Sequence, residues 1–127
     1  MKITNISIQF PKSQFTEIQL QRLAGLGKVS FLEGAGVKCP KDTELLAVNP
    51  DAFGGAAKAK SRLQQLLDTL PNVKYLVLGS SNYSFVDLDY CMQKNIVVSY
   101  VPIYDAESKA EHVIALLLSC TRRIIVN

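Results

Sequence analysis

Apolar residues follow two alternating patterns along the chain. Short apolar runs bounded by turn residues predict strands over residues 3–10, 28–34, 43–49, 73–79 and 96–101. Between these runs, apolar side chains recur at helical spacing, which predicts helices over residues 13–25, 56–70, 87–93 and 106–124. The runs 73–79 and 96–101 are nearly continuous in apolar residues, a pattern typical of strands buried on both faces and hence of a parallel sheet.

The alternation of strands and helices predicts the fold class. It favours an α/β protein with an open, doubly wound parallel sheet of about five strands. Everything up to about Val101 is expected to form one compact domain, with the last predicted helix following it. Ligands of such sheets bind beyond the carboxyl ends of the strands, so the candidate site is expected at that edge.

Composition and charge exclude several classes of protein. The chain has 127 residues with 48% hydrophobic and 20% charged residues, which predicts a folded domain rather than a disordered one. The net charge is only +3, and the densest basic group (Lys58, Lys60 and Arg62) is interpreted as the solvated face of a helix start. Without a basic stripe interleaved with aromatic residues, no nucleic-acid partner is expected. The longest run free of polar residues, VIALLL, is too short to span a bilayer, so no membrane partner is expected.

The three cysteines, Cys39, Cys91 and Cys120, lie far apart, and the chain has a single histidine. This pattern lacks the paired ligands of a zinc site, so no metal is expected. Free thiols are typical of a reducing compartment, and we expect a cytoplasmic protein. Core packing accounts for Cys120, and a structural role in the same predicted helix accounts for His112.

The usual ligands of a doubly wound sheet require residues that the chain lacks. The turn after the first predicted strand reads QFPKSQFT, without the G-x-G-x-x-G of a dinucleotide site or the acidic pair of a phosphoacceptor. No G-K-[ST] sequence is present, and GAG at residues 34–36 is expected to form a loop. Ser13 and Thr16 give only a thin match to the phosphate loop of a flavodoxin. The sequence therefore predicts no phosphate-binding machinery of its own.

The second half of the chain carries a series of motifs in a fixed order. They are Leu70-Pro71-Asn72, Val86-Asp87-Leu88, Ile96-Val97-Val98, Val101-Pro102, and Ser108, Ala110, Glu111 and His112. In order and spacing, this stretch resembles the substrate-binding (catalytic) domain of the D-isomer-specific 2-hydroxyacid dehydrogenases. The turn Pro102-Ile103-Tyr104 is most similar to the D-lactate dehydrogenase branch of that family. The remainder of the chain resembles the family only through its strand–helix pattern and the sequence AVNPD.

The resemblance implies a domain organisation and a reaction. Residues 1–102 would be a flavodoxin-like substrate-binding domain, and residues 103–127 a crossover helix towards a nucleotide-binding domain absent from this chain. The full-length enzyme would transfer a hydride between NAD or NADP and a 2-keto or D-2-hydroxy acid. The family's catalytic arginine, glutamate and histidine follow the crossover helix. We therefore expect no catalytic residue and no bound cofactor in this chain, which would be inactive alone.

The resemblance also assigns site residues. Backbone N–H groups of one loop are expected to cradle the substrate carboxylate, and this substrate site comprises Ser80, Ser81, Asn82 and Tyr104. The residues expected near the cofactor are Asp105, Ala106 and Lys109. The residues expected at an interface are Glu111, His112 and Leu116.

The chain departs from the family in this loop, where the usual glycine-x-glycine is replaced by Ser80-Ser81-Asn82. Asparagine tolerates the left-handed conformation, so Asn82 is expected to keep the shape of the loop. An unusual substrate and a lost activity both remain open. The alternative function is a stand-alone, non-catalytic ligand-binding or regulatory domain with this fold. Because the last predicted helix is apolar on several faces, we also expect a homodimer formed through it.

Overall fold

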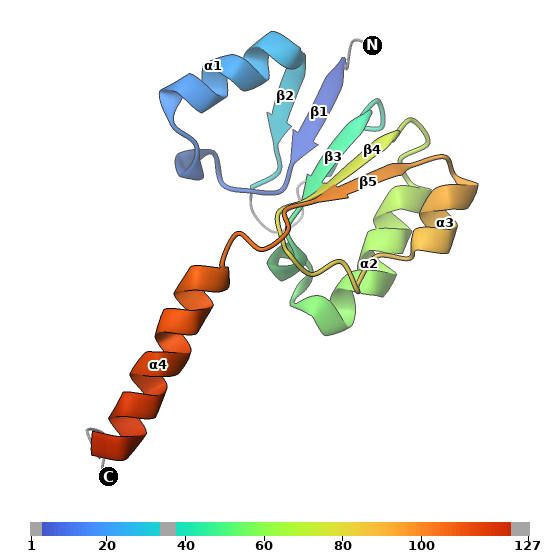
Figure 1. Ribbon diagram of the computed structural model, residues 1–127. Coiled ribbons are helices and arrows are strands. Elements are labelled where there is room, and N and C mark those ends of the chain that lie inside the picture. The colour runs from blue at the N-terminus through green and yellow to red at the C-terminus, as the bar shows by residue number, and fades with distance from the viewer. Residues whose placement is uncertain (1–3, 34–37, 123–127) are drawn as a thin grey trace.

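The computed structural model describes residues 4–33 and 38–122, and it contains one parallel sheet with strand order β2-β1-β3-β4-β5 (Figure 1). The strands are β1 (Asn5–Ile8), β2 (Lys28–Phe31), β3 (Leu45–Val48), β4 (Tyr75–Leu78) and β5 (Val97–Tyr100). The helices are η1 (Lys12–Gln14), α1 (Glu17–Leu26), η2 (Pro50–Phe53), α2 (Ala56–Asp68), α3 (Leu88–Gln93) and α4 (Ala106–Arg122). This strand order is that of flavodoxin-like sheets, so the predicted fold class is confirmed.

Local side-chain contacts determine where the helices begin. Thr16 forms a capping box at α1, because its hydroxyl accepts from the backbone N–H of Gln19 while the Gln19 side chain accepts from the N–H of Thr16. The helix predicted from residue 13 therefore starts later, after the short 3-10 helix η1. The predicted loop at 34–36 and the end of the predicted last helix at 123–124 lie outside the described residues.

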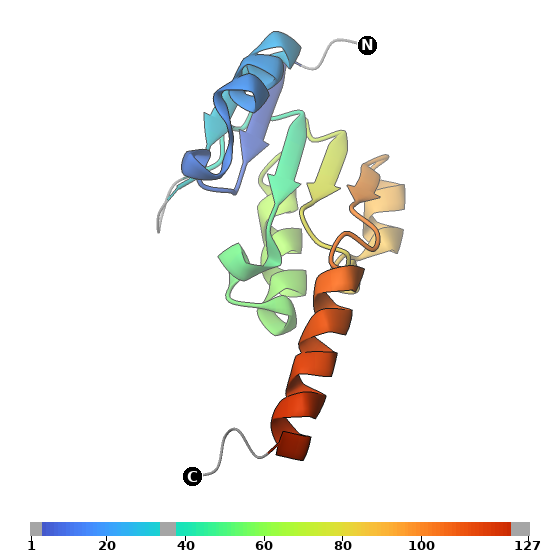
Figure 2. The same ribbon diagram turned by 60° about the vertical axis from the view of Figure 1, so that its left-hand side comes forward.

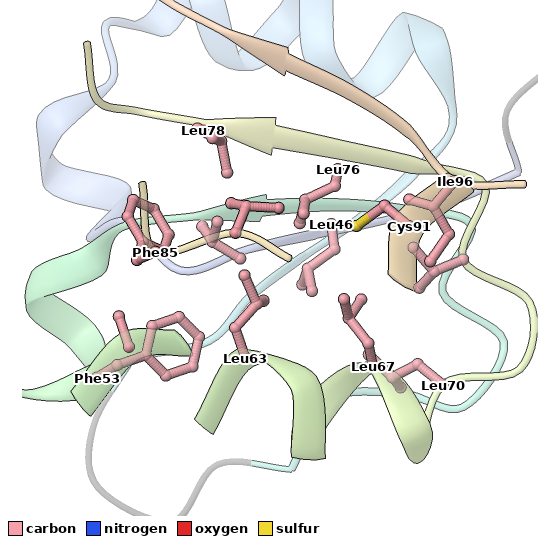
Figure 3. Close-up of a cluster of buried hydrophobic side chains, with 14 residues drawn as sticks. Leu46, Phe53, Leu63, Leu67, Leu70, Leu76, Leu78, Phe85, Cys91 and Ile96 are labelled. Atoms are coloured by element: carbon pink, nitrogen blue, oxygen red, sulfur yellow. The ribbon is translucent and has the colours of Figure 1, made fainter. Parts of the chain in front are cut away.

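One face of the sheet, which we call the closed face, carries the main core. Its strand residues alternate with those of the other face and are Leu46, Val48, Leu76 and Leu78, all fully buried. Helix α2 covers them with one apolar stripe, which comprises Ala59, Leu63 and Leu67 (Figure 3). Cys91 of α3 completes the same cluster. Burying side chains of this size stabilises the fold by about 1.5–3 kcal/mol each.

The opposite face is covered over only part of its width. Ile6 and Ile8 of β1 are buried there, beneath the side on which α1 lies. The same face carries Leu45, Ala47, Val77 and Val97 over β3, β4 and β5. We call this part of the face the open face. Figure 2 shows no helix in front of these three strands among the described residues.

The open face contradicts one sequence prediction. The runs 73–79 and 96–101 were expected to be buried on both faces, but Val77 is only partly buried and Val97 is 59% exposed. The apolar composition of β4 and β5 is that of doubly covered strands, whereas the described residues place helices over these two strands on one side only. The prediction of double burial is therefore wrong for this chain, although the predicted strands and their parallel arrangement are confirmed.

Two helices contribute little to the core. Helix α1 has no buried residue, and Ile18 is 71% exposed. Helix α4 follows β5 through residues 101–105 and points away from the sheet (Figures 1 and 2). Cys120 on α4 is exposed, so its assignment to core packing is wrong. No helix within residues 4–33 and 38–122 has the length and apolar character needed to cross a membrane.

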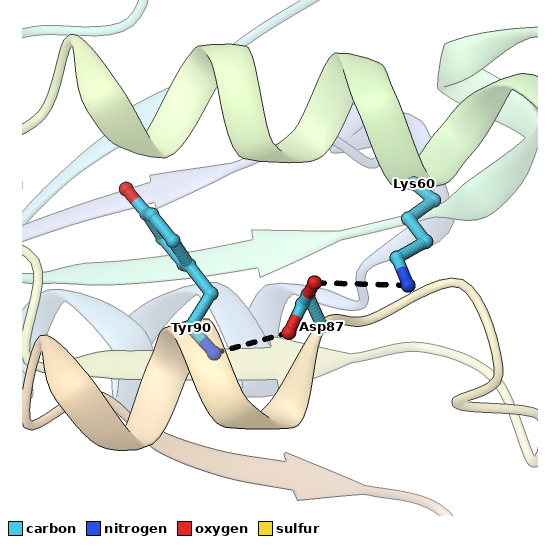
Figure 4. A network of polar contacts seen from close by, with 3 residues as sticks. All are labelled: Lys60, Asp87 and Tyr90. Carbon is cyan, nitrogen blue, oxygen red and sulfur yellow. Dashed lines mark hydrogen bonds and ion pairs between the residues drawn. The ribbon is translucent and has the colours of Figure 1, made fainter.

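Polar contacts join α3 to α2 beside the closed face. Asp87 caps α3 by accepting from the backbone N–H of Tyr90 at 3.0 Å, and its other oxygen lies 3.6 Å from the ammonium of Lys60 on α2 (Figure 4). The N–H of Tyr90, followed by the charge of Lys60, lowers the pKa of Asp87 against the opposing effect of desolvation. The Tyr90 hydroxyl donates to Asp68 at 2.5 Å. Burial first, and then this bond to a carboxylate, raises the pKa of Tyr90 to about 12.

Candidate functional site at the carboxyl edge of the sheet

The candidate site lies where the five parallel strands end. Because all strands run in the same direction, the segments after β1, β3, β4 and β5 meet at one edge of the sheet. The strand order reverses between β1 and β3, which is the position where doubly wound sheets bind ligands. The segments after β1, β3, β4 and β5 contain, in that order, Phe10, Asn49, Gly79 and Val101.

The loop after β4 is held by its own side chains. The Ser80 hydroxyl accepts from the backbone N–H of Asn82 at 3.1 Å, and the Asn82 side-chain oxygen accepts from the N–H of Ser84 at 2.9 Å. Two successive turns of this kind fix the backbone of residues 80–84 without any glycine. The loop is also tied to β5, because the N–H of Val101 donates to the Ser80 carbonyl at 3.4 Å.

This geometry corrects one expectation and supports another. Asn82 is not left-handed, since the non-glycine residues with positive φ in the described chain are Asn95 and Ile103. Asn82 instead shapes the loop through its side-chain oxygen. Within the described residues, the backbone N–H groups of Ser80 and Ser81 have no hydrogen-bond partner. Two unpaired N–H groups in a fixed loop can bind a carboxylate.

Phe10 contacts the first residue of this loop. A Cβ atom added to Gly79 would lie 2.0 Å from the Cζ atom of the Phe10 ring, so a larger residue would fit here only if the ring moved. The ring thus bridges the ends of β1 and β4, two strands separated by β3. This contact was not predicted from the sequence. The position of Phe10 directly after a strand was its only signal, because the pairing with Gly79 is not visible in the sequence.

Aromatic side chains surround the end of β5. Tyr83 of the loop and Tyr100 of β5 have ring centroids 5.1 Å apart, and neither was predicted as a site residue. Tyr104, the predicted lining residue, is 62% exposed in the segment between β5 and α4. The preceding residue, Ile103, has φ 54°, a left-handed conformation that is strained for a β-branched side chain.

The residues assigned to the cofactor lie at the start of α4. Asp105 precedes the helix and forms an ion pair of 2.7 Å with Lys109, one turn later, while Ala106 is the first helical residue. The hydrogen bond and then the charge of Asp105 raise the pKa of Lys109. The two side chains are thus joined to each other. To contact a cofactor, the two side chains would have to separate or to bind it together as a pair.

The predicted interface residues Glu111, His112 and Leu116 are all exposed on α4. His112 is the single histidine of the chain. Among residues 4–33 and 38–122, no three His, Cys, Asp or Glu side chains cluster as metal ligands would. The edge of the sheet offers N–H donors, hydroxyls and aromatic rings.

Comparison with known proteins gives a consistent result. Residues 38–125 match the family model described as D-isomer specific 2-hydroxyacid dehydrogenase, catalytic domain. The D-lactate dehydrogenase of Escherichia coli is 40% identical over 52 residues, which cover 41% of this chain and 16% of that protein. A 2-hydroxyacid dehydrogenase of Staphylococcus saprophyticus is 30% identical over 109 residues, which cover 85% of this chain and 34% of that protein.

A solved structure agrees in fold. The D-lactate dehydrogenase of Aquifex aeolicus, complexed with NAD and lactic acid, superimposes with a TM-score of 0.68 at 26% identity and covers 91% of this chain and 33% of that one. The chain thus spans about a third or less of the length of the relatives it matches.

Proposed function

This chain belongs to the D-isomer specific 2-hydroxyacid dehydrogenase family, and we propose that it is the substrate-binding part of an oxidoreductase that interconverts 2-keto acids and D-2-hydroxy acids. The observation that carries the proposal is the loop after β4, where the N–H groups of Ser80 and Ser81 are unpaired among the described residues. In this role they bind the substrate carboxylate, Asn82 keeps the loop in shape, and Tyr104 lines the site. Residues 1–102 form the substrate domain, and residues 103–127 form the crossover helix.

The cofactor in this proposal is NAD or NADP, bound mainly by protein outside this chain. The turn after β1 contains Phe10 and the 3-10 helix η1 instead of a glycine-rich phosphate loop, so this edge does not fit a dinucleotide phosphate. Asp105, Ala106 and Lys109 would face the cofactor from the start of α4. In this proposal the groups that transfer the hydride and the proton lie outside this chain, so the chain alone is inactive.

We further propose that the chain forms a homodimer through α4 in a reducing, cytoplasmic compartment. Support for self-association comes from large apolar side chains that α4 leaves exposed, such as Val113 and Leu117 at 63% and 62%. Glu111, His112 and Leu116 lie on the same helix and would contribute to the interface. Support for the compartment comes from the three free cysteines.

Calorimetric titration of the chain with pyruvate tests the proposed carboxylate site. We expect binding of pyruvate and none of its neutral amide, because the N–H groups recognise the charge. Ser81→Pro removes one N–H donor and should abolish binding, whereas Ser81→Ala removes only the hydroxyl and should retain it. If the folded wild-type protein binds none of a series of 2-keto acids, the alternative function, a stand-alone ligand-binding or regulatory domain, is favoured instead. If Ser81→Ala and Ser81→Pro weaken binding equally, the backbone cradle is wrong.

A further inference from the structure

We propose that a cavity between α1 and β2 binds a small zwitterionic ligand with an apolar side chain, of the class of the aliphatic α-amino acids. We call it the edge cavity, and it is bounded by Lys12, Glu17, Leu20, Ala24, Val29 and Phe31. It lies at the end of the sheet opposite β5 (Figure 1), and its described lining comes from η1, α1 and β2 alone. The edge cavity is therefore separate from the proposed carboxylate site and does not rest on the function proposed above.

The edge cavity exists because α1 is loosely packed on the sheet. Leu20 and Leu23 of α1 are only partly buried, and so are Val29 and Phe31 of β2. The space that remains between the helix and the strand has a volume of about 370 Å³. This volume lies within the range of about 300–1,000 Å³ that is typical of small-molecule sites. Packed protein interiors leave few voids larger than a water molecule, so a space of this size has room for a ligand.

The edge cavity is polar at one end and apolar at the other. Glu17 is the first residue of α1, and Lys12 lies in η1, shortly before it in the chain. Leu20 and Ala24 follow Glu17 by one and two helical turns on the same side of α1. A ligand that fills the cavity would therefore have its charged groups beside Lys12 and Glu17 and an apolar group against Leu20 and Ala24.

The two charges at the polar end have opposite signs and no partner of their own. Among the described residues, neither the Lys12 ammonium nor the Glu17 carboxylate forms an ion pair or a hydrogen bond. Glu33 accepts from the backbone N–H of Lys12, which ties η1 to the end of β2 and leaves the Lys12 ammonium unpaired. An α-amino acid carries both charges on one carbon, so its ammonium can bind Glu17 while its carboxylate binds Lys12.

Ligands with a single charge fit the edge cavity less well. A simple carboxylic acid would pair with Lys12 but would bring a second negative charge close to Glu17. An amine would pair with Glu17 and would bring a second positive charge close to Lys12. Beyond the polar end the lining is apolar, so the side chain of the ligand is aliphatic or aromatic rather than polar.

Calorimetric titration of the 127-residue chain with L-leucine tests the edge cavity. L-leucine should bind, whereas isocaproate and isoamylamine, which each lack one of its two charges, should bind more weakly. Lys12→Met and Glu17→Gln should each weaken the binding of leucine, by roughly threefold to tenfold. The matched controls are Lys41→Met and Glu107→Gln, which remove exposed charges outside the cavity lining and should leave the binding unchanged.

A second variant tests the apolar end without changing either charge. Ala24→Phe places a ring in the edge cavity and should abolish the binding of leucine. Ala24 is exposed, so the variant should fold, and circular dichroism checks that it does. Ile18→Phe is the matched control, because Ile18 is a 71% exposed residue of the same helix outside the cavity lining.

Leucine also carries the carboxylate that the loop at residues 80–84 is proposed to bind, so the two sites must be distinguished. If Ser81→Pro abolishes the binding of leucine, or if pyruvate competes with it, leucine binds at that loop and the edge cavity is overturned. The edge cavity is also overturned if the wild type binds neither leucine nor phenylalanine, or if it binds isocaproate as tightly as leucine. Pyruvate binding, and its loss in Ser81→Pro, still reports separately on the proposed function.

Discussion

The two faces of the sheet use the same strands and similar residues, yet only one is a completed core. In β4, Leu76 and Leu78 point to the closed face and are fully buried, whereas Val77 between them points to the open face and is partly exposed. The difference does not arise in the strands. It arises because α2 presents Leu63 and Leu67 to one face, while the other face has α1 over β1 and β2 and no described helix beyond them.

This contrast separates what a strand contributes from what its covering helix contributes. An apolar side chain stabilises the fold in proportion to the surface that its neighbours remove from water. The closed face therefore accounts for most of the stability of the chain alone. The open face has the composition for a second core, and it would gain stability only when a helix covers it.

The largest expected effect comes from truncating a residue of the closed face. Leu76→Ala should lower the free energy of unfolding by about 2–5 kcal/mol, because it leaves a cavity in a packed cluster. Val77→Ala, the adjacent substitution on the open face, should lower it by only about 1 kcal/mol. Urea denaturation of dilute protein measures both. Equal losses would mean that the open face is covered in solution and would remove the contrast.

Much of this architecture could be read from the sequence. Hydrophobic periodicity predicted five strands and four longer helices, and their alternation predicted the parallel, doubly wound sheet. Asp87 was correctly placed at the start of the short helix α3, since a side chain that accepts from the helix N–H groups is a local feature. Local patterns of this kind depend on a few neighbouring residues and are therefore visible in one sequence.

The errors concern partners that are distant in the chain. The apolar run at 96–101 predicted a doubly buried strand because composition reports suitability for burial, not the presence of a covering helix. Cys120 was assigned to the core for the same reason and is exposed. At the candidate site, the family resemblance indicated the loop at Ser80–Asn82. It could not indicate that Phe10, from the other end of the chain, lies on Gly79.

A smaller effect is expected at the carboxyl edge of the sheet, at the contact of Phe10 with Gly79. Gly79→Ala should lower the free energy of unfolding by about 1–3 kcal/mol, because the new methyl group would overlap the Phe10 ring unless the ring moves. Gly79 has no positive φ, so alanine itself is not strained there. In a Phe10→Ala background the same substitution should be neutral or stabilising by up to about 1 kcal/mol. A double-mutant cycle by urea denaturation measures the coupling, and independent effects would contradict the contact.

The smallest expected effect is a pH dependence confined to the polar contacts beside the closed face. The folded state raises the pKa of Tyr90 from its ordinary value near 10 to about 12, so the unfolded chain loses this proton first as the pH increases. The stabilising contribution is therefore complete below about pH 10 and is lost between about pH 10 and 12. Tyr90→Phe removes the hydroxyl that donates to Asp68, so the stability of this variant should fall less steeply than that of the wild type between about pH 10 and 12.

Tyr83→Phe is the matched control, because Tyr83 lies in the loop at the candidate site and its hydroxyl contacts neither α2 nor Asp68 in the described structure. Parallel pH curves for wild type and Tyr90→Phe, measured by urea denaturation, would show that the bond between Tyr90 and Asp68 does not help to hold α3 on α2.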